Sequence, residues 1–183
     1  MSPELQDHLF SKYPRLFKNY GYVMSPSSRG IQCGDGWFAI ISRLCKSIQG
    51  RIDYSRTAKA RILLFNRALK AGIEGRHGLL HSYFQFGEKS YKVEPWIVDR
   101  VHDEIAEAQF KLPKDAVRQV YFHQIKQKHG SLCINYIGGD SYIEGMIGMA
   151  HSVSGDICEK CGRTGKKDLA WGLSVLSRDC GCK

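Results

Sequence analysis

Residues 117–139 read "VRQVYFHQIKQKHGSLCINYIGG", and this stretch predicts the β-structure of the chain. Strand-forming residues precede and follow a central "KHGS", among them Val120, Phe122 and Ile134. Gly130 supplies the positive φ that a tight hairpin turn needs. The stretch therefore predicts an antiparallel hairpin at about residues 117–137. Apolar residues on both of its faces predict that other elements cover both sides.

The segments before the hairpin have the apolar spacing of helices. Asp35 can cap a helix over residues 35–49, in which apolar residues recur every third or fourth position. Thr57 can cap a second helix that ends at Gly72. The predicted inward face of this second helix consists of Ala58, Ile62, Phe65 and Leu69.

Shorter signals predict the remaining elements. Pro3 favours a helix at the start of the chain, and Asp140 or Ser141 can cap one after the hairpin. Residues 78–93 are ambiguous, and "LLHSYFQF" within them favours a strand. Pro95 begins another helix, whose predicted inward residues are Trp96, Val101 and Ile105.

Together these elements predict an α+β fold, with helices packed on a small antiparallel sheet and a zinc knuckle near the C-terminus. The 183 residues suffice for one domain with its own core. We expect an α+β body over residues 1–150, a basic insertion at about 51–112, and a zinc-knuckle appendage over 151–183.

Composition and charge limit the classes of partner. Hydrophobic residues make up 43% of the chain, and no run approaches the roughly 20 apolar residues that span a bilayer. The start "MSPELQDHLF" lacks the layout of a signal peptide, so we expect a cytoplasmic protein with no membrane partner. The net charge of +9 favours polyanions or acidic protein surfaces without choosing between them.

Seven cysteines in a chain without an export signal indicate reduced or metal-bound thiols rather than disulfides. Four of them fall within the last 26 residues: Cys158, Cys161, Cys180 and Cys182. Zinc in structural sites takes four ligands of this kind in a tetrahedral arrangement. The sequence therefore predicts a structural zinc site, with His151 as the alternative ligand if Cys180 or Cys182 does not bind. The alternative is four free thiols near the chain end.

A catalytic role for this zinc is disfavoured by the same four residues. Catalytic zinc sites keep an open position for water, whereas four thiolates fill the coordination shell. The sequence has no His-Glu-x-x-His motif, and no His-x-Glu precedes the knuckle. We therefore expect the zinc to stabilise the fold.

Two blocks of the chain resemble a known group of proteins. "PSSRGIQCGDGW" (26–37) and "QIKQKHGSLCINYIGGDSYIEGMIGMAHSVSGDICEKCG" (124–162) resemble segments of small uncharacterised proteins from tailed bacteriophages and prophages. In those proteins a Gly-Asp-Gly-Trp helix start precedes a Lys-x-Lys-aromatic-Gly hairpin, a helix and a Cys-Glu-x-Cys-Gly knuckle. His129 departs from the pattern, because an aromatic residue is usual at its position, and residues 51–112 have no counterpart. The resemblance implies a phage or prophage origin, hence a bacterial host cytoplasm, and a zinc knuckle; it implies no activity.

Other polar clusters have both a catalytic and a structural interpretation. Asp35, Asp140 and Glu144 could hold Mg²⁺ for phosphodiester chemistry, but an Asp beside glycines is more often a helix cap, which we favour. Cys133 shares the hairpin with His123, and a buried thiol between Leu132 and Ile134 is the favoured interpretation over a nucleophile. The same applies to Cys33 and Cys45, which we place in or near the core.

Basic residues gather in the segment 51–92 and alternate with tyrosines. Basic side chains can follow phosphates, and aromatic rings can stack on bases. An ordinary solvated helix face is an equally good interpretation. The candidate residues for binding nucleic acid or a partner are Arg56, Lys59, Arg67, Lys70 and Arg76.

Three functional hypotheses follow. The first is a non-enzymatic phage accessory protein with a structural zinc, which binds and modulates a host protein or protein–nucleic-acid complex, as an inhibitor of host machinery or of a defence system. The second is a DNA- or RNA-binding protein that uses the basic segment 51–92. The third is a metal-dependent phosphodiesterase or nuclease that uses Asp35, Asp140 and Glu144.

Overall fold

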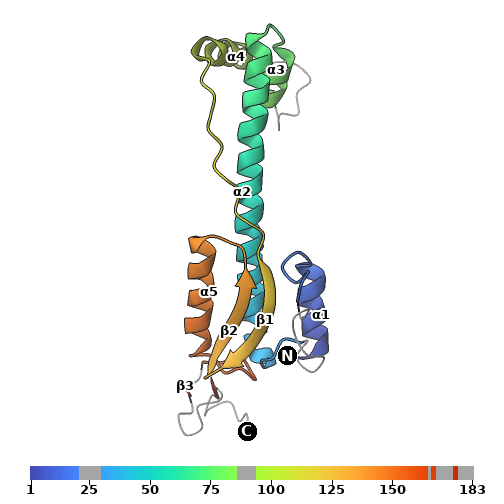
Figure 1. The fold of residues 1–183 in the computed structure, drawn as a ribbon, viewed down its shortest axis with the longest axis vertical. Coiled ribbons are helices and arrows are strands. Elements are labelled where there is room, and N and C mark those ends of the chain that lie inside the picture. The colour runs from blue at the N-terminus through green and yellow to red at the C-terminus, as the bar shows by residue number, and fades with distance from the viewer. Residues whose placement is uncertain (21–29, 86–93, 165, 168–174, 177–183) are drawn as a thin grey trace. The chain divides into compact units, whose positions relative to one another are not determined.

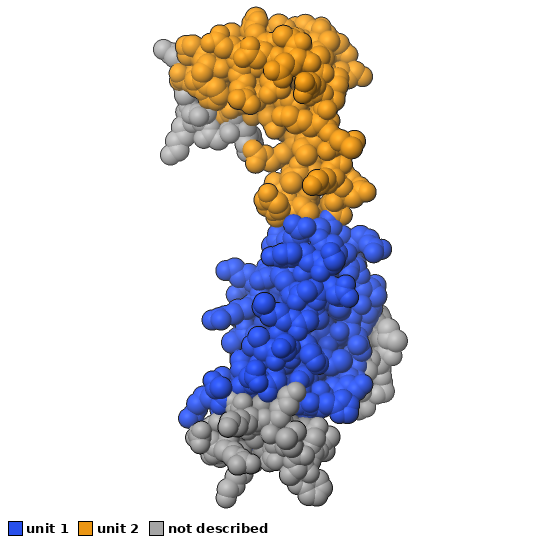
Figure 2. All heavy atoms as spheres, turned by 90° about the vertical axis from the view of Figure 1, so that its left-hand side faces the viewer, with its two compact units in different colours: residues 1–53, 117–183 blue, residues 54–116 orange. Residues whose placement is uncertain are grey.

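The computed structural model describes residues 1–20, 30–85, 94–164, 166–167 and 175–176. The chain forms two compact units, which Figure 2 colours separately. Unit 1 consists of residues 1–53 and 117–183, and unit 2 consists of residues 54–116. Unit 2 overlaps the segment 51–112 that the sequence sets apart, whereas residues 151–183, the expected zinc-knuckle appendage, are grouped with the hairpin in unit 1.

The secondary structure confirms the α+β class (Figure 1). Unit 1 contains helix α1, a short 3-10 turn η2, the first part of helix α2, the hairpin β1–β2, helix α5 and the short pair β3–β4. Unit 2 contains the rest of α2 with α3 and α4. The bounds are α1 Pro3–Lys12, η2 Asp35–Trp37, α2 Phe38–Ile73, α3 Gly78–Gln85, α4 Pro95–Glu107, β1 Tyr121–Lys128, β2 Ser131–Ile137, α5 Ser141–Ser154, β3 Lys166–Lys167 and β4 Val175–Leu176.

The predicted hairpin is confirmed, with strands that pair antiparallel from Tyr121↔Ile137 to Lys128↔Ser131. His129 (φ 52°) and Gly130 (φ 72°) form the two-residue turn. Positive φ at both turn positions is the geometry whose twist suits a hairpin. Gln32 extends β1 on its other side, because its N–H donates to Ile125 O (2.9 Å) and its O accepts from Gln127 N (2.8 Å).

A single helix of 36 residues, α2, replaces the two helices predicted before residue 73. Thr57 lies inside this helix and is not an N-cap, and Asp35 opens the preceding 3-10 turn, whose N-cap is Gly34. No proline interrupts residues 38–73, and Gly50 alone costs only about 1 kcal/mol relative to alanine. The chain therefore stays helical through the predicted break.

Two expectations for unit 2 were wrong. Residues 78–85 form helix α3 rather than a strand; residues 86–93 lie outside the described residues. Helix α4 does begin at Pro95, and Val101 is buried as predicted, but Trp96 is 50% exposed. Its neighbour Ile97 occupies the inward position instead, which leaves an indole ring at the surface.

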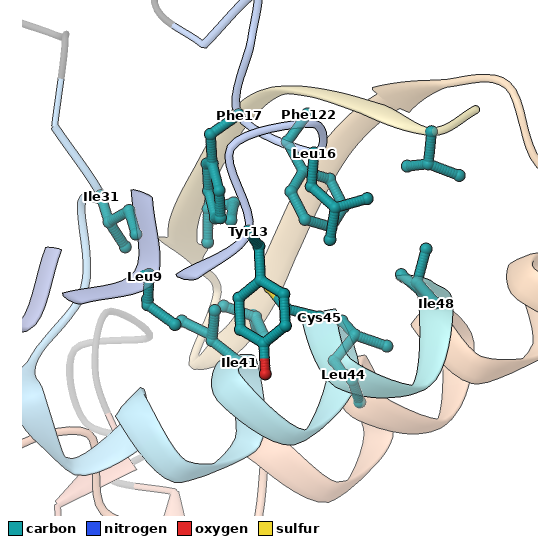
Figure 3. Packing of buried hydrophobic residues seen from close by; sticks show 14 of the residues in the cluster. Leu9, Tyr13, Leu16, Phe17, Ile31, Ile41, Leu44, Cys45, Ile48 and Phe122 are labelled. Carbon is teal, nitrogen blue, oxygen red and sulfur yellow. The ribbon is translucent and has the colours of Figure 1, made fainter. Parts of the chain in front are cut away.

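Unit 1 has a continuous core in which α1, α2, the hairpin and α5 meet. Figure 3 shows Tyr13 and Phe17 after α1, the α2 side chains Ile41 and Ile48, and Phe122 of β1 within this cluster. Unit 2 has a separate and smaller core, which packs α2 against α3 and α4. Its buried members are Phe65, Ala68, Leu69, Leu80, Ile97 and Val101.

Candidate functional site

The sequence Cys158–Cys161 forms a tight turn shortly after α5, which ends at Ser154. Cys158 N donates to Arg163 O (2.8 Å), and Gly162 N donates back to Cys158 O (2.9 Å). Gly162 has φ 75°, a conformation that favours glycine. Cys158 is buried and Cys161 is exposed. This turn presents two thiols from one short loop, as the first half of a zinc knuckle requires.

The Gly-Asp-Gly-Trp segment packs directly on this turn, although more than 100 residues separate the two in sequence. Gly36 N donates to Glu159 O (2.7 Å), and Trp37 Nε1 donates to Ile157 O (2.8 Å). A Cβ on Gly36 would lie closer than 3 Å to the backbone at Cys158, Cys161 and Gly162. The two motifs that carry the phage resemblance are therefore in contact, and glycine is required where they touch.

Of the other predicted zinc ligands, the structure describes only His151. Cys180 and Cys182 lie outside the described residues. His151 Nδ1 lies 2.9 Å from Leu132 O, so one of its ring nitrogens is engaged with the hairpin. Within the described ranges, no three His, Cys, Asp or Glu side chains cluster as a metal site would require. The donor chemistry of Cys158 and Cys161 fits zinc, and a complete site needs ligands beyond these two.

The remaining described cysteines have the character of core thiols. Burial raises the pKa of Cys33 to about 12; the positive charge of the N-terminus lowers this pKa, and the negative charges of Glu159 and Asp35 raise it. Burial also raises the pKa of Cys45 above its ordinary value. Cys133 is half-buried on β2, opposite Lys126. A raised pKa suppresses the thiolate, so Cys33 and Cys45 are poor nucleophiles at neutral pH.

The predicted carboxylate site consists of residues with structural contacts. Asp140 caps α5, as predicted, by accepting from Ile143 N (3.1 Å), and it also pairs with Arg51 (3.0 Å). Its partial burial raises its pKa, but the Ile143 amide and the Arg51 guanidinium outweigh burial and hold the pKa below its usual value. Asp35 accepts from Ser2 N at 2.6 Å. Glu144 is exposed on α5, one turn after Asp140.

The predicted basic residues all lie in unit 2. At 100° per residue, the four on α2, Arg56, Lys59, Arg67 and Lys70, share one face of the helix. Lys59 pairs with Asp115 at 2.9 Å, and the fifth residue, Arg76, pairs with Glu74. This basic face of α2 is thus a surface feature, neutralised in part by Asp115.

The sequence did not predict a large groove in unit 2, which has a volume of about 1060 Å³. Residues of α2, α3 and α4 form its walls, with Lys111 from the segment after α4. Three cationic side chains line it: Arg61, Arg100 and Lys111. One sequence signal could have indicated that Trp96 is exposed in this groove. Ile97, Val101 and Ile105 recur every fourth residue and form the inward face of α4, and Trp96 lies off that face.

A second and smaller groove, of about 500 Å³, lies in unit 1 between α2 and α5. Ile40 and Leu44 of α2 line one side, and Met146, Met149 and Val153 of α5 line the other. Met149 is 69% exposed, and Arg43 is the one charged residue among the described residues that line it. It is an apolar surface with little polar content.

Comparison with protein-family models, curated proteins and solved structures finds no match for this chain. Among the helices in the described ranges, none has the length and apolar character needed to cross a bilayer. The interpretation of function therefore rests on the geometry of the two units.

Proposed function

We propose that this chain is a phage accessory protein that binds a host protein through unit 2, while unit 1 serves as a scaffold fastened by structural zinc. The observation that carries the proposal is the surface of unit 2. Nine of the thirteen exposed large hydrophobic side chains among the described residues belong to unit 2, although it is the smaller unit. Three of them, Leu64, Leu79 and Trp96, line one groove, and exposed apolar side chains gathered in this way mark sites of interaction in soluble proteins.

The balance between core and surface in unit 2 supports the same proposal. Its described core has six buried apolar residues, whereas that of unit 1 has eighteen. Leu64, Leu79 and Trp96 are each about half exposed, and all three line the groove. Side chains that contribute little to the fold in their exposed positions are available to a partner.

The proposed zinc belongs to the scaffold. Cys158 and Cys161 would supply two thiolates from the turn on which Gly36 and Trp37 pack. An ion there would fix the C-terminal turn against the start of α2, and this fastening is what structural zinc contributes in small domains. Cys180 and Cys182 are the proposed remaining ligands, with His151 as the alternative.

Site-specific photocrosslinking in host cells tests this proposal. A photoreactive phenylalanine analogue would replace Leu79 in unit 2 or, as a control, Tyr142 in unit 1, which is 63% exposed. We expect a crosslinked host protein at Leu79 that survives nuclease treatment, and no such product at Tyr142. Absence of any crosslinked protein at Leu79, or loss of the product on nuclease treatment, would refute the proposal.

Nucleic-acid binding is the second candidate, and the basic face of α2 favours it. Arg56, Arg67 and Lys70 are exposed on that face, as phosphate contacts require. Such binding predicts an affinity that falls steeply with salt, and that falls further in a variant with these residues reversed in charge. Binding that does not change between about 50 and about 200 mM salt would exclude it. No comparable observation favours the phosphodiesterase hypothesis.

A further inference from the structure

We propose that the groove of unit 2 binds an amphipathic α-helix of the partner protein whose flanks carry acidic residues. This inference rests on the proposed function, because it names the chemistry of the partner that unit 2 engages. It follows from three features of the groove: the shape of its α2 wall, its exposed apolar side chains and the sign of its charges.

The α2 wall of the groove is itself a helical face with small residues at its centre. Thr57, Ala60, Arg61 and Leu64 follow the spacing i, i+3, i+4 and i+7, so they share one side of α2. Ala60 and Thr57 leave room for another helix to approach at the usual interaxial distance of about 8–10 Å. The groove volume of about 1060 Å³ lies at the upper end of the range of roughly 300–1,000 Å³ typical of small-molecule sites. A groove of this size, lined by residues of three helices, has room for an extended ligand.

The apolar side chains of the groove point to a peptide rather than to nucleic acid. Leu64 and Leu79 are 52% and 49% exposed and offer no ring on which a base could stack, so Trp96 is the one exposed ring among the large hydrophobic side chains at least a third exposed that line the groove in the described residues. Tyr83 and Phe84 also line the groove, but both pack on Phe65 in the core of unit 2. Apolar residues on one side of a helix would bury these leucines, as in other helix-in-groove complexes.

The charges of the groove specify the flanks of that helix. Arg61, Arg100 and Lys111 line it, and no carboxylate stands among its described lining residues. The guanidinium of Arg100 lies over Phe84 (5.2 Å) and 3.6 Å from Glu104. The amine of Lys111 lies 3.9 Å from the centre of the Phe65 ring. Acidic residues on the incoming helix would complement these cations.

The overall charge argues against a second copy of the chain as the occupant. At +9 per chain, two copies repel each other unless acidic surface on one meets the groove of the other. The acidic helix of a different protein meets no such penalty. The net charge therefore favours a heterologous partner.

Selection from a displayed library of random peptides of about 16 residues, roughly four helical turns, tests the inference. The bait is the full chain, and the counter-selection bait is its Leu64→Asp variant. We expect enriched peptides to have apolar residues at helical spacing and an excess of Asp and Glu. A fluorescein-labelled synthetic copy of an enriched peptide is then titrated, with fluorescence anisotropy as the readout and oligothymidylate as competitor.

Adjacent residues on α2 provide matched controls. Leu63 is 50% exposed, like Leu64, but it lies on the basic face and does not line the groove. We expect Leu64→Asp and Arg61→Glu to weaken peptide binding about tenfold or more, and Leu63→Asp and Arg67→Glu to change it less than about twofold. Circular dichroism of each variant establishes that unit 2 keeps its helices.

Three results would overturn the inference: enrichment of peptides without helical apolar spacing, equal losses in groove and control variants, or displacement of the peptide by oligothymidylate. An empty selection would also overturn it. If crosslinking at Leu79 still captures a host protein in that case, the proposed function stands and only the helical, acidic ligand is refuted. If crosslinking fails as well, both fall.

Discussion

The contact between Gly36 and the cysteine turn can be tested by adding a single methyl group, in Gly36→Ala. The new Cβ would lie 2.8 Å from Cys161 N and closer still to Cys158 O and Gly162 N. All three are backbone atoms, so no side chain can rotate away to make room. To relieve the overlap, the backbone of either the cysteine turn or the segment that leads into α2 must shift.

The cost can be worked from these contacts. Overpacking of a tight site costs about 1–3 kcal/mol, and backbone neighbours place this site at about 3 kcal/mol. Displacement of the turn would also break the bonds from Gly36 N to Glu159 O and from Trp37 Nε1 to Ile157 O, at about 1 kcal/mol each. We therefore expect Gly36→Ala to lower the free energy of unfolding of unit 1 by about 3–5 kcal/mol.

Urea denaturation followed by tryptophan fluorescence measures this change. A Trp96→Phe background leaves the two tryptophans of unit 1 as the only ones. For a urea dependence of about 2 kcal/mol per molar, the midpoint should fall by roughly 1.5–2.5 M. The matched control is Gly50→Ala in the adjoining helix α2, where a Cβ meets nothing within 4 Å. Alanine there should raise stability by about 0.5–1 kcal/mol, because glycine weakens a helix interior.

A loss of stability in Gly36→Ala together with a gain in Gly50→Ala would support the contact between Gly36 and the cysteine turn. If Gly36→Ala instead lowers the free energy of unfolding by less than about 1 kcal/mol, a value ordinary for point mutations, the packing of the Gly-Asp-Gly-Trp segment on the cysteine turn is wrong.

Three further predictions address the thiols and the cap of α5. Purified protein should contain about one zinc ion per chain by elemental analysis, and Cys158→Ser should lose it; a metal-free wild type would contradict the proposed fastening. After chelation at pH 8, iodoacetamide should alkylate Cys161 rapidly and leave Cys33 and Cys45 unmodified until urea is added, since burial raises the pKa of both. The lowered pKa of Asp140 stabilises the fold above the unfolded value of about 3.9, and this contribution is lost as pH falls through the folded pKa. The urea midpoint should therefore drop more between about pH 5 and pH 3 in the wild type than in Asp140→Asn, and parallel curves would argue against that linkage.

Local signals allowed the hairpin and α5 to be predicted. Gly130 fixes a turn between strand-forming residues, and Asp140 caps the next helix within three residues of itself. The long helix α2 was predicted as two helices because threonine is a common N-cap residue, which makes Thr57 a candidate start for a second helix. Nothing at residue 57 makes the chain turn here, and the apolar contacts on both sides hold the helix together.

The features that depend on distant residues were beyond the reach of such signals. The knuckle was predicted from its cysteines, but its contact with Gly36 joins positions more than 100 residues apart. The groove of unit 2 requires α3, which was predicted as a strand, and an exposed Trp96, which was predicted as inward. Because α3 was predicted as a strand and Trp96 as a core residue, the surface that we propose to be functional was not predicted from the sequence.

The order of unit 1 along the chain has a consequence for synthesis on the ribosome. Residues 1–53 emerge first, yet Ile41 and Ile48 pack against strands that begin only at Tyr121. At translation rates of about 5–20 residues per second, the 63 residues of unit 2 impose a delay of roughly 3–13 s. During this interval the apolar face of the first part of α2 has no strands to pack against, while unit 2, whose residues are contiguous in sequence, can fold before unit 1.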